Sequence, residues 1–176
     1  LPILIKHFSV PREMHVHVGP ARVFDTEDQA VDALLARHVV PGDVVVIRYE
    51  GPKANGMPEM YYATAIIASS KELSATCAVI TDGRYSGAAK GPAVGHITPE
   101  AMDGGPLALV HEGDLIEIHV PDRRLAVVGT AEAGRLDPDA VDAVLATRRA
   151  SWVKPKSRHV KGILSLYGRV GAGANE

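Results

Sequence analysis

Cysteine and aromatic residues are scarce in this sequence of 176 residues, which has a single cysteine and 5% aromatic residues. One cysteine excludes an internal disulfide and fits the reducing environment of the cytoplasm. No apolar run approaches the roughly 20 residues that a membrane-spanning helix needs. Residues 1–5 form an apolar run that is too short, and lacks the basic lead, for a secretory signal. We therefore expect a cytoplasmic protein that has no membrane partner.

An excess of charge of one sign is also lacking. The net charge is −2 and no basic tract is present, which argues against nucleic acid as a partner. A hydrophobic content of 46% and a charged content of 23% are ordinary for a globular protein. This length suits one domain with a sizeable core, so we assign residues 1–176 to a single domain. The chain starts without Met, inside a predicted strand, and we expect it to be a piece of a longer protein.

Short apolar runs separated by turns predict about seven strands. These are residues 1–6, 14–18, 44–47, 77–80, 107–110, 115–120 and 125–128. Helices are predicted where a capping residue or a proline precedes an apolar stripe. They run from Thr26, from Glu59 to about Ser70, from Thr98, from Asp137 to about Arg149, and over residues 160–167. Thr26 with Gln29 three residues later predicts a capping box for the first of them.

The order of these elements indicates the fold class. The strands are short and regular crossover helices do not separate them, which disfavours a doubly wound sheet. We predict a mixed α/β fold, rich in strands, in which a β-barrel-like or sandwich sheet carries short helices on its flanks. Residues 44–47 are apolar at every position, so we expect this strand to be buried on both faces.

A glycine-rich loop follows the apolar run at residues 77–80. Glycines at this density allow backbone N–H groups to approach a ligand closely. The loop carries five groups capable of chemistry, which are Asp82, Arg84, Ser86, Lys90 and His96. Two interpretations remain open, a ligand-binding loop and a surface loop with solvated polar side chains.

Another loop of similar composition, which is the first of the two in chain order, follows the strand at residues 44–47. It carries Glu50, Lys53, Asn55 and Glu59. If the two strands are neighbours in the sheet, both loops converge on one rim. Such a rim suits a small anionic substrate, or a hard divalent cation held by carboxylate oxygens.

Ser86 has three possible roles. As an acyl-transfer nucleophile it would lack the glycine that stands two residues before the serine in a nucleophile elbow. As a proton acceptor it would need a nearby cation, such as Arg84, Lys90 or a metal ion, to lower the pKa of its hydroxyl. It can also be a plain loop serine. His96 is equally compatible with a structural role and with donating to a substrate.

The cysteine and two of the histidines belong to types that can bind metals, but their positions in the sequence favour other roles. Cys77 lies within an apolar run, which favours a core position over a ligand role. His15 and His17 alternate with apolar residues and would share one strand face. No third histidine or cysteine is near them in the sequence, so an exposed polar face is favoured over a metal site.

Several longer motifs occur in the same order as in a known family. They are residues 19–24 (GPARVF), 45–53 (VVIRYEGPK), 56–60 (GMPEM), 80–87 (ITDGRYSG), 95–101 (GHITPEA) and 104–106 (GGP). Over nearly its whole length the chain resembles the C-terminal domain of the dihydroxyacid dehydratase and 6-phosphogluconate dehydratase family. The resemblance implies a swivelling β-barrel-like domain with flanking short helices, which closes over a larger N-terminal domain.

The resemblance also implies a reaction and roles for two residues. The family removes water from 2,3-dihydroxy acids to give 2-oxo-3-deoxy acids, with an iron–sulfur cluster and a magnesium ion as cofactors. Ser86, in the motif of Gly-Arg, an aromatic residue and Ser-Gly, would be the base that takes the C2 proton. Glu59, in the motif GMPEM, would be a magnesium ligand. Arg84, Lys90, His96 and Asp82 are the candidate substrate-binding residues.

The resemblance places most of the cofactor chemistry elsewhere. The family's cluster cysteines and its remaining magnesium ligands belong to the N-terminal domain, so we expect neither cofactor to bind this chain alone and the isolated domain to be inactive. We expect the full enzyme to be a homo-oligomer that acts on a small dihydroxy acid. Residues 53–56 and 98–105 look more like the sugar-acid dehydratases, and residues 88–92, which include Lys90, differ from the corresponding loop of the branched-chain enzyme. A sugar acid is therefore the expected substrate. The alternative substrate is a branched-chain dihydroxy acid. The alternative functions of the chain are a non-catalytic stand-alone binding module and a serine hydrolase.

Overall fold

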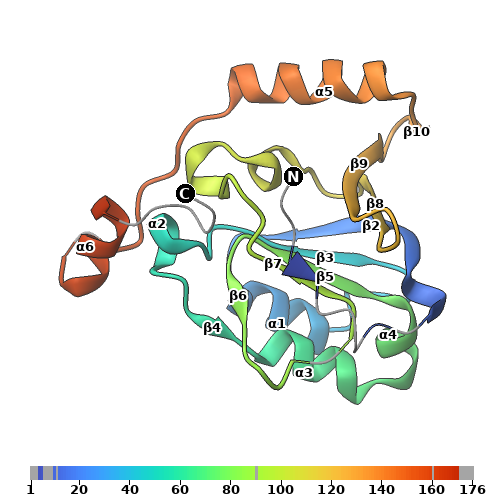
Figure 1. The fold of residues 1–176 in the computed structure, drawn as a ribbon, viewed down its shortest axis with the longest axis horizontal. Helices are drawn as coiled ribbons and strands as arrows, with labels where there is room; N and C mark the ends of the chain where they lie inside the picture. The colour runs from blue at the N-terminus through green and yellow to red at the C-terminus, as the bar shows by residue number, and fades with distance from the viewer. Residues whose placement is uncertain (1–3, 6–9, 11, 90, 160, 171–176) are drawn as a thin grey trace.

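A mixed sheet forms the centre of the chain (Figure 1). The computed structural model describes residues 4–5, 10, 12–89, 91–159 and 161–170. Their strands are β1 (Leu4–Ile5), β2 (Val16–Phe24), β3 (Val44–Ile47), β5 (Ala78–Thr81), β7 (Ala93–Gly95), β8 (Leu115–His119), β9 (Arg124–Thr130) and β10 (Gly134–Arg135), in the spatial order β1-β7-β5-β3-β2-β8-β9-β10. A separate pair of short strands consists of β4 (Glu59–Met60) and β6 (Arg84–Tyr85).

Helices cover both sides of this sheet. They are α1 (Glu27–Leu35), α2 (Pro52–Asn55), α3 (Tyr62–Ser69), α4 (Lys71–Thr76), α5 (Pro138–Ser151) and α6 (Ile163–Val170), with 3-10 turns η2 (Arg12–Met14), η3 (Ala101–Asp103) and η4 (Pro106–Leu109). In Figure 1, α1, α3 and α4 lie below the sheet, while α5 lies above it. The polar connector after α5 leads to α6 at the side of the molecule.

The parallel strands at the centre are buried on both faces. Strands β2, β3, β5 and β7 are parallel neighbours. Val44 and Val46 of β3 point into one apolar cluster, whereas Val45 and Ile47 point into a second cluster shared with α1 and α3. The predicted two-sided burial of residues 44–47 is therefore confirmed, since successive side chains of a strand face opposite sides.

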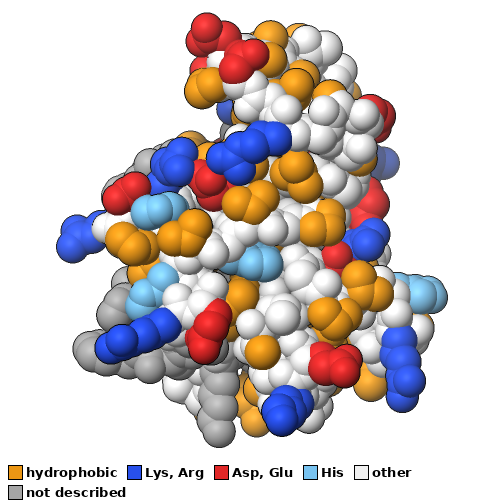
Figure 2. Space-filling view, turned by 90° about the vertical axis from the view of Figure 1, so that its right-hand side faces the viewer, with side chains coloured by type: hydrophobic (Ala, Val, Ile, Leu, Met, Phe, Trp, Pro, Cys, Tyr) orange, Lys and Arg blue, Asp and Glu red, His pale blue; other side chains and the backbone are white. Residues whose placement is uncertain are grey.

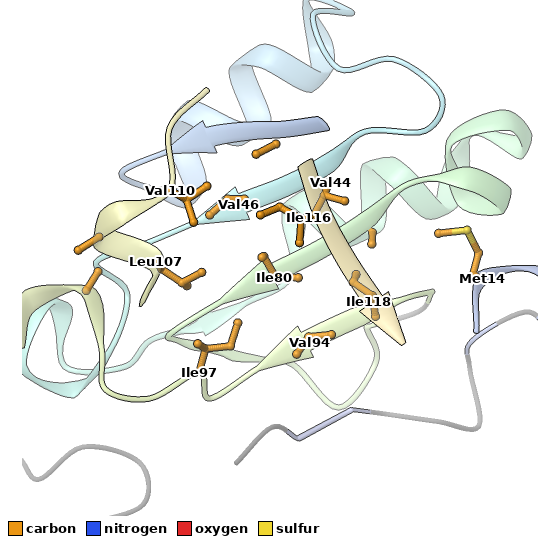
Figure 3. Close-up of a cluster of buried hydrophobic side chains, with 14 of the residues drawn as sticks. Met14, Val44, Val46, Ile80, Val94, Ile97, Leu107, Val110, Ile116 and Ile118 are labelled. Carbon is orange, nitrogen blue, oxygen red and sulfur yellow. The ribbon is translucent and has the colours of Figure 1, made fainter. Parts of the chain in front are cut away.

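The antiparallel part of the sheet folds back over the parallel part. Ile116 and Ile118 of β8 lie in the same cluster as Val46, Ile80 and Val94, and Figure 3 shows β8 crossing over the parallel strands. Within the described residues no pairing joins the two ends of the strand order, so the sheet is open. The mixed α/β fold is confirmed, and "barrel-like" holds in the sense of a sheet that covers its own face.

Three predicted elements differ from the structure. Residues 107–110 were predicted as a strand but belong mainly to the 3-10 turn η4, which has Pro106 at its first position. The helix predicted from Glu59 starts at Tyr62, because Glu59 and Met60 pair with β6 instead. The helix predicted from Thr98 is only the 3-10 turn η3, and the Thr98–Pro99 peptide bond is cis.

Predicted helix caps agree with the structure. The Thr26 hydroxyl accepts a hydrogen bond from the Gln29 N–H at 3.1 Å, and the Gln29 side chain accepts one from the Asp25 N–H. The Asp137 carboxylate accepts from the Ala140 N–H at 2.9 Å at the start of α5. Both caps satisfy N–H groups that have no partner within the helix.

The end of α5 is tied to the sheet by a buried ion pair. The Arg148 guanidinium donates to both carboxylate oxygens of Asp114, which is 1% exposed, and to the Leu109 carbonyl at 3.0 Å. This bidentate contact joins α5 to the turn before β8, and it fixes the point from which the connector departs.

No helix among the described residues has the length and apolar character needed to cross a bilayer. On the face shown in Figure 2, acidic and basic side chains are interspersed among apolar ones. This mixed surface agrees with the small net charge of the sequence.

Candidate functional site

The two glycine-rich loops meet through the parallel pairing of β4 with β6. Glu59 lies opposite Arg84, and Met60 lies opposite Tyr85. The Ser86 N–H then donates to the Met60 carbonyl at 2.9 Å. The predicted convergence of the loops after β3 and β5 is therefore confirmed, and it brings the segment of Ser86 beside the segment of Glu59.

Glu59 and Arg84 form a partly exposed ion pair. The Glu59 Oε1 lies 3.6 Å from the Arg84 Nη1, and the two side chains are 55% and 47% exposed. Arg84 Nε donates to the Met57 carbonyl at 2.9 Å, which ties its guanidinium to the loop of Glu59. An exposed carboxylate held this loosely is accessible to a cation or to a substrate.

Ser86 is partly buried in a tight turn of the second loop. Its hydroxyl oxygen accepts from the Ala88 N–H at 3.4 Å, and its carbonyl accepts from the Ala89 N–H at 3.1 Å.

Gly83, three residues before Ser86, packs against the first loop. A Cβ on Gly83 would lie 2.8 Å from the Glu50 Cβ and 2.9 Å from the Glu50 carbonyl oxygen, so only glycine permits this approach.

Asp82 holds the backbone of the site in place. It is 1% exposed, and its carboxylate accepts from the N–H groups of Tyr49 (3.2 Å), Glu50 (3.0 Å) and Ala101 (2.8 Å). Burial raises the pKa of this carboxyl group, and the three backbone donors oppose that shift. Asp82 thus joins the first loop and η3 to the end of β5, while its role toward a substrate stays a prediction.

His96 lies beside the same loop. Its backbone is in the left-handed region with φ 57°, and its N–H donates to the Gly83 carbonyl at 2.9 Å. Burial, and secondly the positive charge of Arg84, lower the pKa of the imidazole. A neutral imidazole can accept or donate a hydrogen bond to a substrate hydroxyl. Lys90, the remaining candidate residue, lies outside the described residues.

The lowered pKa of His96 predicts a loss of stability in acid. Because the folded chain disfavours the imidazolium, this contribution is fully present above the ordinary pKa of 6.5 and is lost as the pH falls through the lower folded pKa. Urea unfolding between about pH 8 and about pH 5 is expected to show a smaller loss of stability for His96→Asn than for the wild type. Asparagine is chosen because it tolerates the left-handed backbone.

The control for this prediction is His38→Asn, at an exposed position three residues after the end of α1. It is expected to keep the pH dependence of the wild type. An identical pH dependence for wild type and His96→Asn would contradict the account of His96.

Two buried acids organise the first loop, and the sequence predicted neither role. Glu50 was named only as one of the polar groups of this loop, and Glu100 only as part of a motif. Glu50 is 3% exposed and accepts from the Glu27 N–H at 3.1 Å and from the Asn55 amide. Glu100 is 1% exposed and accepts from the N–H groups of Lys53 (2.9 Å) and Ala54 (3.3 Å). The sequence offered one signal of a structural role for Glu50: it lies three residues after a fully buried strand and just before Gly51-Pro52.

Of the two cofactors that the resemblance implies, the side chains present fit the magnesium ion in part and do not fit the iron–sulfur cluster. Glu59 offers exposed carboxylate oxygens, the ligand type that Mg²⁺ prefers. In the described part of the chain, no group of three or more His, Cys, Asp or Glu side chains could hold a metal ion. The exposed face predicted for His15 and His17 is wrong, because both are half-buried while Val16 and Val18 are exposed. Cys77 does not fit an iron–sulfur cluster, because it is fully buried, its thiol donates to the Val40 carbonyl at 3.2 Å, and burial raises its pKa.

Fold and loop geometry together define a class of domain: a mixed α/β domain that carries a hydroxyl, a carboxylate and a guanidinium on two converging loops. The comparison with protein families makes this specific. Residues 3–176 match the model of the dihydroxy-acid/6-phosphogluconate dehydratase C-terminal domain, and the chain belongs to this family.

Individual relatives agree with this assignment. Dihydroxy-acid dehydratases of Ruminiclostridium cellulolyticum and Methanosarcina barkeri are 44% identical over 168 residues and 46% identical over 173 residues. These alignments cover 95% and 98% of this chain but only 28% and 29% of the relatives. A third, from Agathobacter rectalis, is 46% identical over 93% of this chain and 27% of its own length. The chain thus spans less than a third of the relatives it matches.

Proposed function

We propose that this domain supplies the base and one magnesium ligand to a hydro-lyase that converts 2,3-dihydroxy acids into 2-oxo-3-deoxy acids. The register of β4 and β6 carries the proposal, because it brings the Glu59 carboxylate beside the loop of Ser86. Membership of the dehydratase family supports the reaction class. The much greater length of the relatives supports a further domain that completes the site, and the full-length protein below means the chain together with that domain.

In the proposed reaction the Ser86 Oγ, as the alkoxide, takes the hydrogen of substrate C2 as a proton. The electrons of that bond form a C2–C3 double bond while the 3-hydroxyl group leaves as hydroxide. The proton taken from C2, or one exchanged for it from solvent, converts the hydroxide into water, and Ser86 returns to the alkoxide. The resulting enol then tautomerises to the 2-oxo acid. Arg84, two residues before Ser86, supplies positive charge that favours the alkoxide and the substrate carboxylate. Neutral His96 offers a hydrogen bond to a substrate hydroxyl.

Two cofactors would complete this chemistry. A magnesium ion held partly by Glu59 would neutralise the substrate carboxylate and lower the pKa of nearby hydroxyl groups, whereas an iron–sulfur cluster would act as Lewis acid on the leaving hydroxyl. The cluster would have to be held outside the described residues, because Cys77 is buried in the core.

Replacement of Glu59 is expected to weaken magnesium binding. In the full-length protein, Glu59→Gln removes one anionic oxygen ligand and should raise the magnesium Kd about tenfold or more, on the scale of losses seen for metal-site partners. Isothermal titration of Mg²⁺ into the apo protein measures this. Glu72→Gln, on the exposed side of α4, is the matched control and should leave the Kd unchanged. Equal Kd values for wild type and Glu59→Gln would contradict the ligand role.

An assay of the full-length protein against a panel of acids tests the function itself. The panel holds a branched-chain 2,3-dihydroxy acid and several aldonic acids, and formation of the 2-oxo acid is measured. The relatives are named dihydroxy-acid dehydratases, which does not distinguish among the acids of the panel, whereas residues 53–56 and 98–105 favour a sugar acid. Substrate binding without turnover of any acid would favour the non-catalytic module. Labelling of Ser86 by a fluorophosphonate would favour a serine hydrolase.

A further inference from the structure

The connector between α5 and α6 contacts the first site loop through two adjacent residues. The Arg158 guanidinium donates to the Glu50 Oε1 at 3.2 Å, to the Tyr49 carbonyl at 2.6 Å and to the Asp25 carbonyl at 2.5 Å. The neighbouring His159 Nε2 lies 2.5 Å from the Asn55 Oδ1. One guanidinium therefore joins three acceptors from the ends of β2 and β3.

These contacts form a closed network around one buried acid. Asn55 donates its side-chain N–H to Glu50 Oε2, so Glu50 is held by Arg158 from one side and by Asn55 from the other. The Glu50 side chain is 3% exposed, and a buried carboxylate is stable only with a charged or hydrogen-bonding partner. Arg158 provides the positive charge in this network.

Glu50 in turn borders the loop that carries Ser86. The Gly83 Cα lies so close to Glu50 that an added Cβ would come within 2.8 Å of the Glu50 Cβ. The next residue, Arg84, forms the ion pair with Glu59 across β4 and β6. A shift of Glu50 therefore moves Gly83, and with it the register that aligns Glu59 with Ser86.

The contacts of Arg158 end on the site loops, whereas α5 is anchored independently. Arg148 binds Asp114, and Arg149 donates to the Gly104 carbonyl at 2.9 Å. Loss of Arg158 therefore leaves both anchors of α5 in place. This separation distinguishes a residue that positions the loops from one that holds the fold together.

We propose that Arg158 is a positioning residue, which acts through Glu50 and Gly83 to hold the loops of Glu59 and Ser86 in register. The inference rests on the proposed function for its effect on turnover, while its effect on the loops is independent of the reaction. The connector thereby links the C-terminal part of the chain to the geometry of the site.

The test compares Arg158→Ala, Arg158→Lys and the control Arg149→Ala in the full-length protein. For Arg158→Ala, kcat should fall about 10- to 100-fold while KM changes less than about threefold, since a small misplacement of the reacting groups has effects of this size. Hydrogen exchange should become faster in peptides covering residues 48–60 and 82–88 and stay unchanged in β8 and β9. Lysine keeps the charge but not the three-fold contact, so it should restore only part of kcat. Arg149→Ala removes an anchor of α5, and it should keep the wild-type kcat and the wild-type exchange of residues 48–60 and 82–88.

A double variant tests whether Arg158 acts through Glu50. With Glu50→Gln the buried negative charge is gone, and adding Arg158→Ala should reduce kcat by less than it does alone. Wild-type kcat and wild-type loop exchange in Arg158→Ala would overturn the proposal. So would faster exchange spread evenly over the protein with kcat unchanged, which is the result of a purely structural role.

The two proposals fail separately in this design. If the wild type dehydrates no acid, the proposed function fails, and loop exchange alone then decides the role of Arg158. If Arg158→Ala does not fold, Arg158→Lys supplies both measurements.

Discussion

Ser86→Ala in the full-length protein is expected to lower kcat by about 10²- to 10⁴-fold while substrate Kd changes less than about threefold, the range over which a general base contributes. The Ser86 hydroxyl lies on the loop that β6 aligns with Glu59, and the Ser86 N–H donates to the carbonyl of Met60, the residue after Glu59. Alanine removes the proton acceptor but keeps the Ser86 N–H that donates to Met60. Binding contacts made by the rest of the site therefore persist. Steady-state kinetics with a titration of substrate binding measure both quantities.

Ser74→Ala is the matched control for this variant. Its hydroxyl donates to the Lys71 carbonyl on exposed α4, away from both site loops. It should retain wild-type kcat. Unchanged turnover in Ser86→Ala would reject Ser86 as the base and leave the plain loop serine as its role.

Asp82→Ala is expected to destabilise the chain by about 3–5 kcal/mol, since it leaves buried backbone donors without partners. Three N–H groups, from Tyr49, Glu50 and Ala101, donate to this carboxylate. An orphaned buried donor costs about 1–3 kcal/mol, and water that enters the vacated space reduces the total to the lower end of the sum. The first loop and η3 would lose their common attachment to the end of β5. Urea unfolding at neutral pH measures the change in free energy.

Asp122→Ala serves as the control for Asp82→Ala. Its carboxylate is 67% exposed and pairs with His119 at 3.2 Å in a surface turn. Exposed pairs contribute about 0–1 kcal/mol, so the variant should unfold close to the wild type. A loss below about 1 kcal/mol for Asp82→Ala would show that water or other groups replace the carboxylate, and the account of Asp82 would be wrong.

Local patterns predicted the central elements well. The apolar run at residues 44–47 predicted a strand buried on both faces, and Thr26 with Gln29 predicted the start of α1. The convergence of the two loops was predicted on the condition that their strands are neighbours in the sheet, and the structure meets this condition because β3 and β5 are parallel neighbours. In these cases a short-range pattern and the tertiary structure favour the same conformation.

Tertiary contacts account for the elements that were predicted wrongly. Pro58 and Glu59 suit the first turn of a helix, yet pairing of Glu59 with Arg84 selects a strand. Residues 107–110 form a short apolar run, and such a run does not distinguish a strand from a helical turn that starts at Pro106.

Long-range polar contacts were beyond local patterns altogether. Arg158 and Glu50 are 108 residues apart in the sequence, and no local pattern around either residue indicates that they form an ion pair. The same holds for Glu100, whose carboxylate binds the N–H groups of Lys53 and Ala54 some 46–47 residues earlier. Contacts of this kind are defined only by the folded chain.

The fate of the C2 hydrogen tests most directly whether the two loops form the base side of a dehydratase site. A 2,3-dihydroxy acid deuterated at C2 is incubated with the full-length wild type, Ser86→Ala and Ser74→Ala, and deuterium release into water is followed by NMR. The account predicts release by the wild type and Ser74→Ala in step with formation of the 2-oxo acid, and a rate at least about 100-fold lower for Ser86→Ala. Release by Ser86→Ala at the wild-type rate would contradict it.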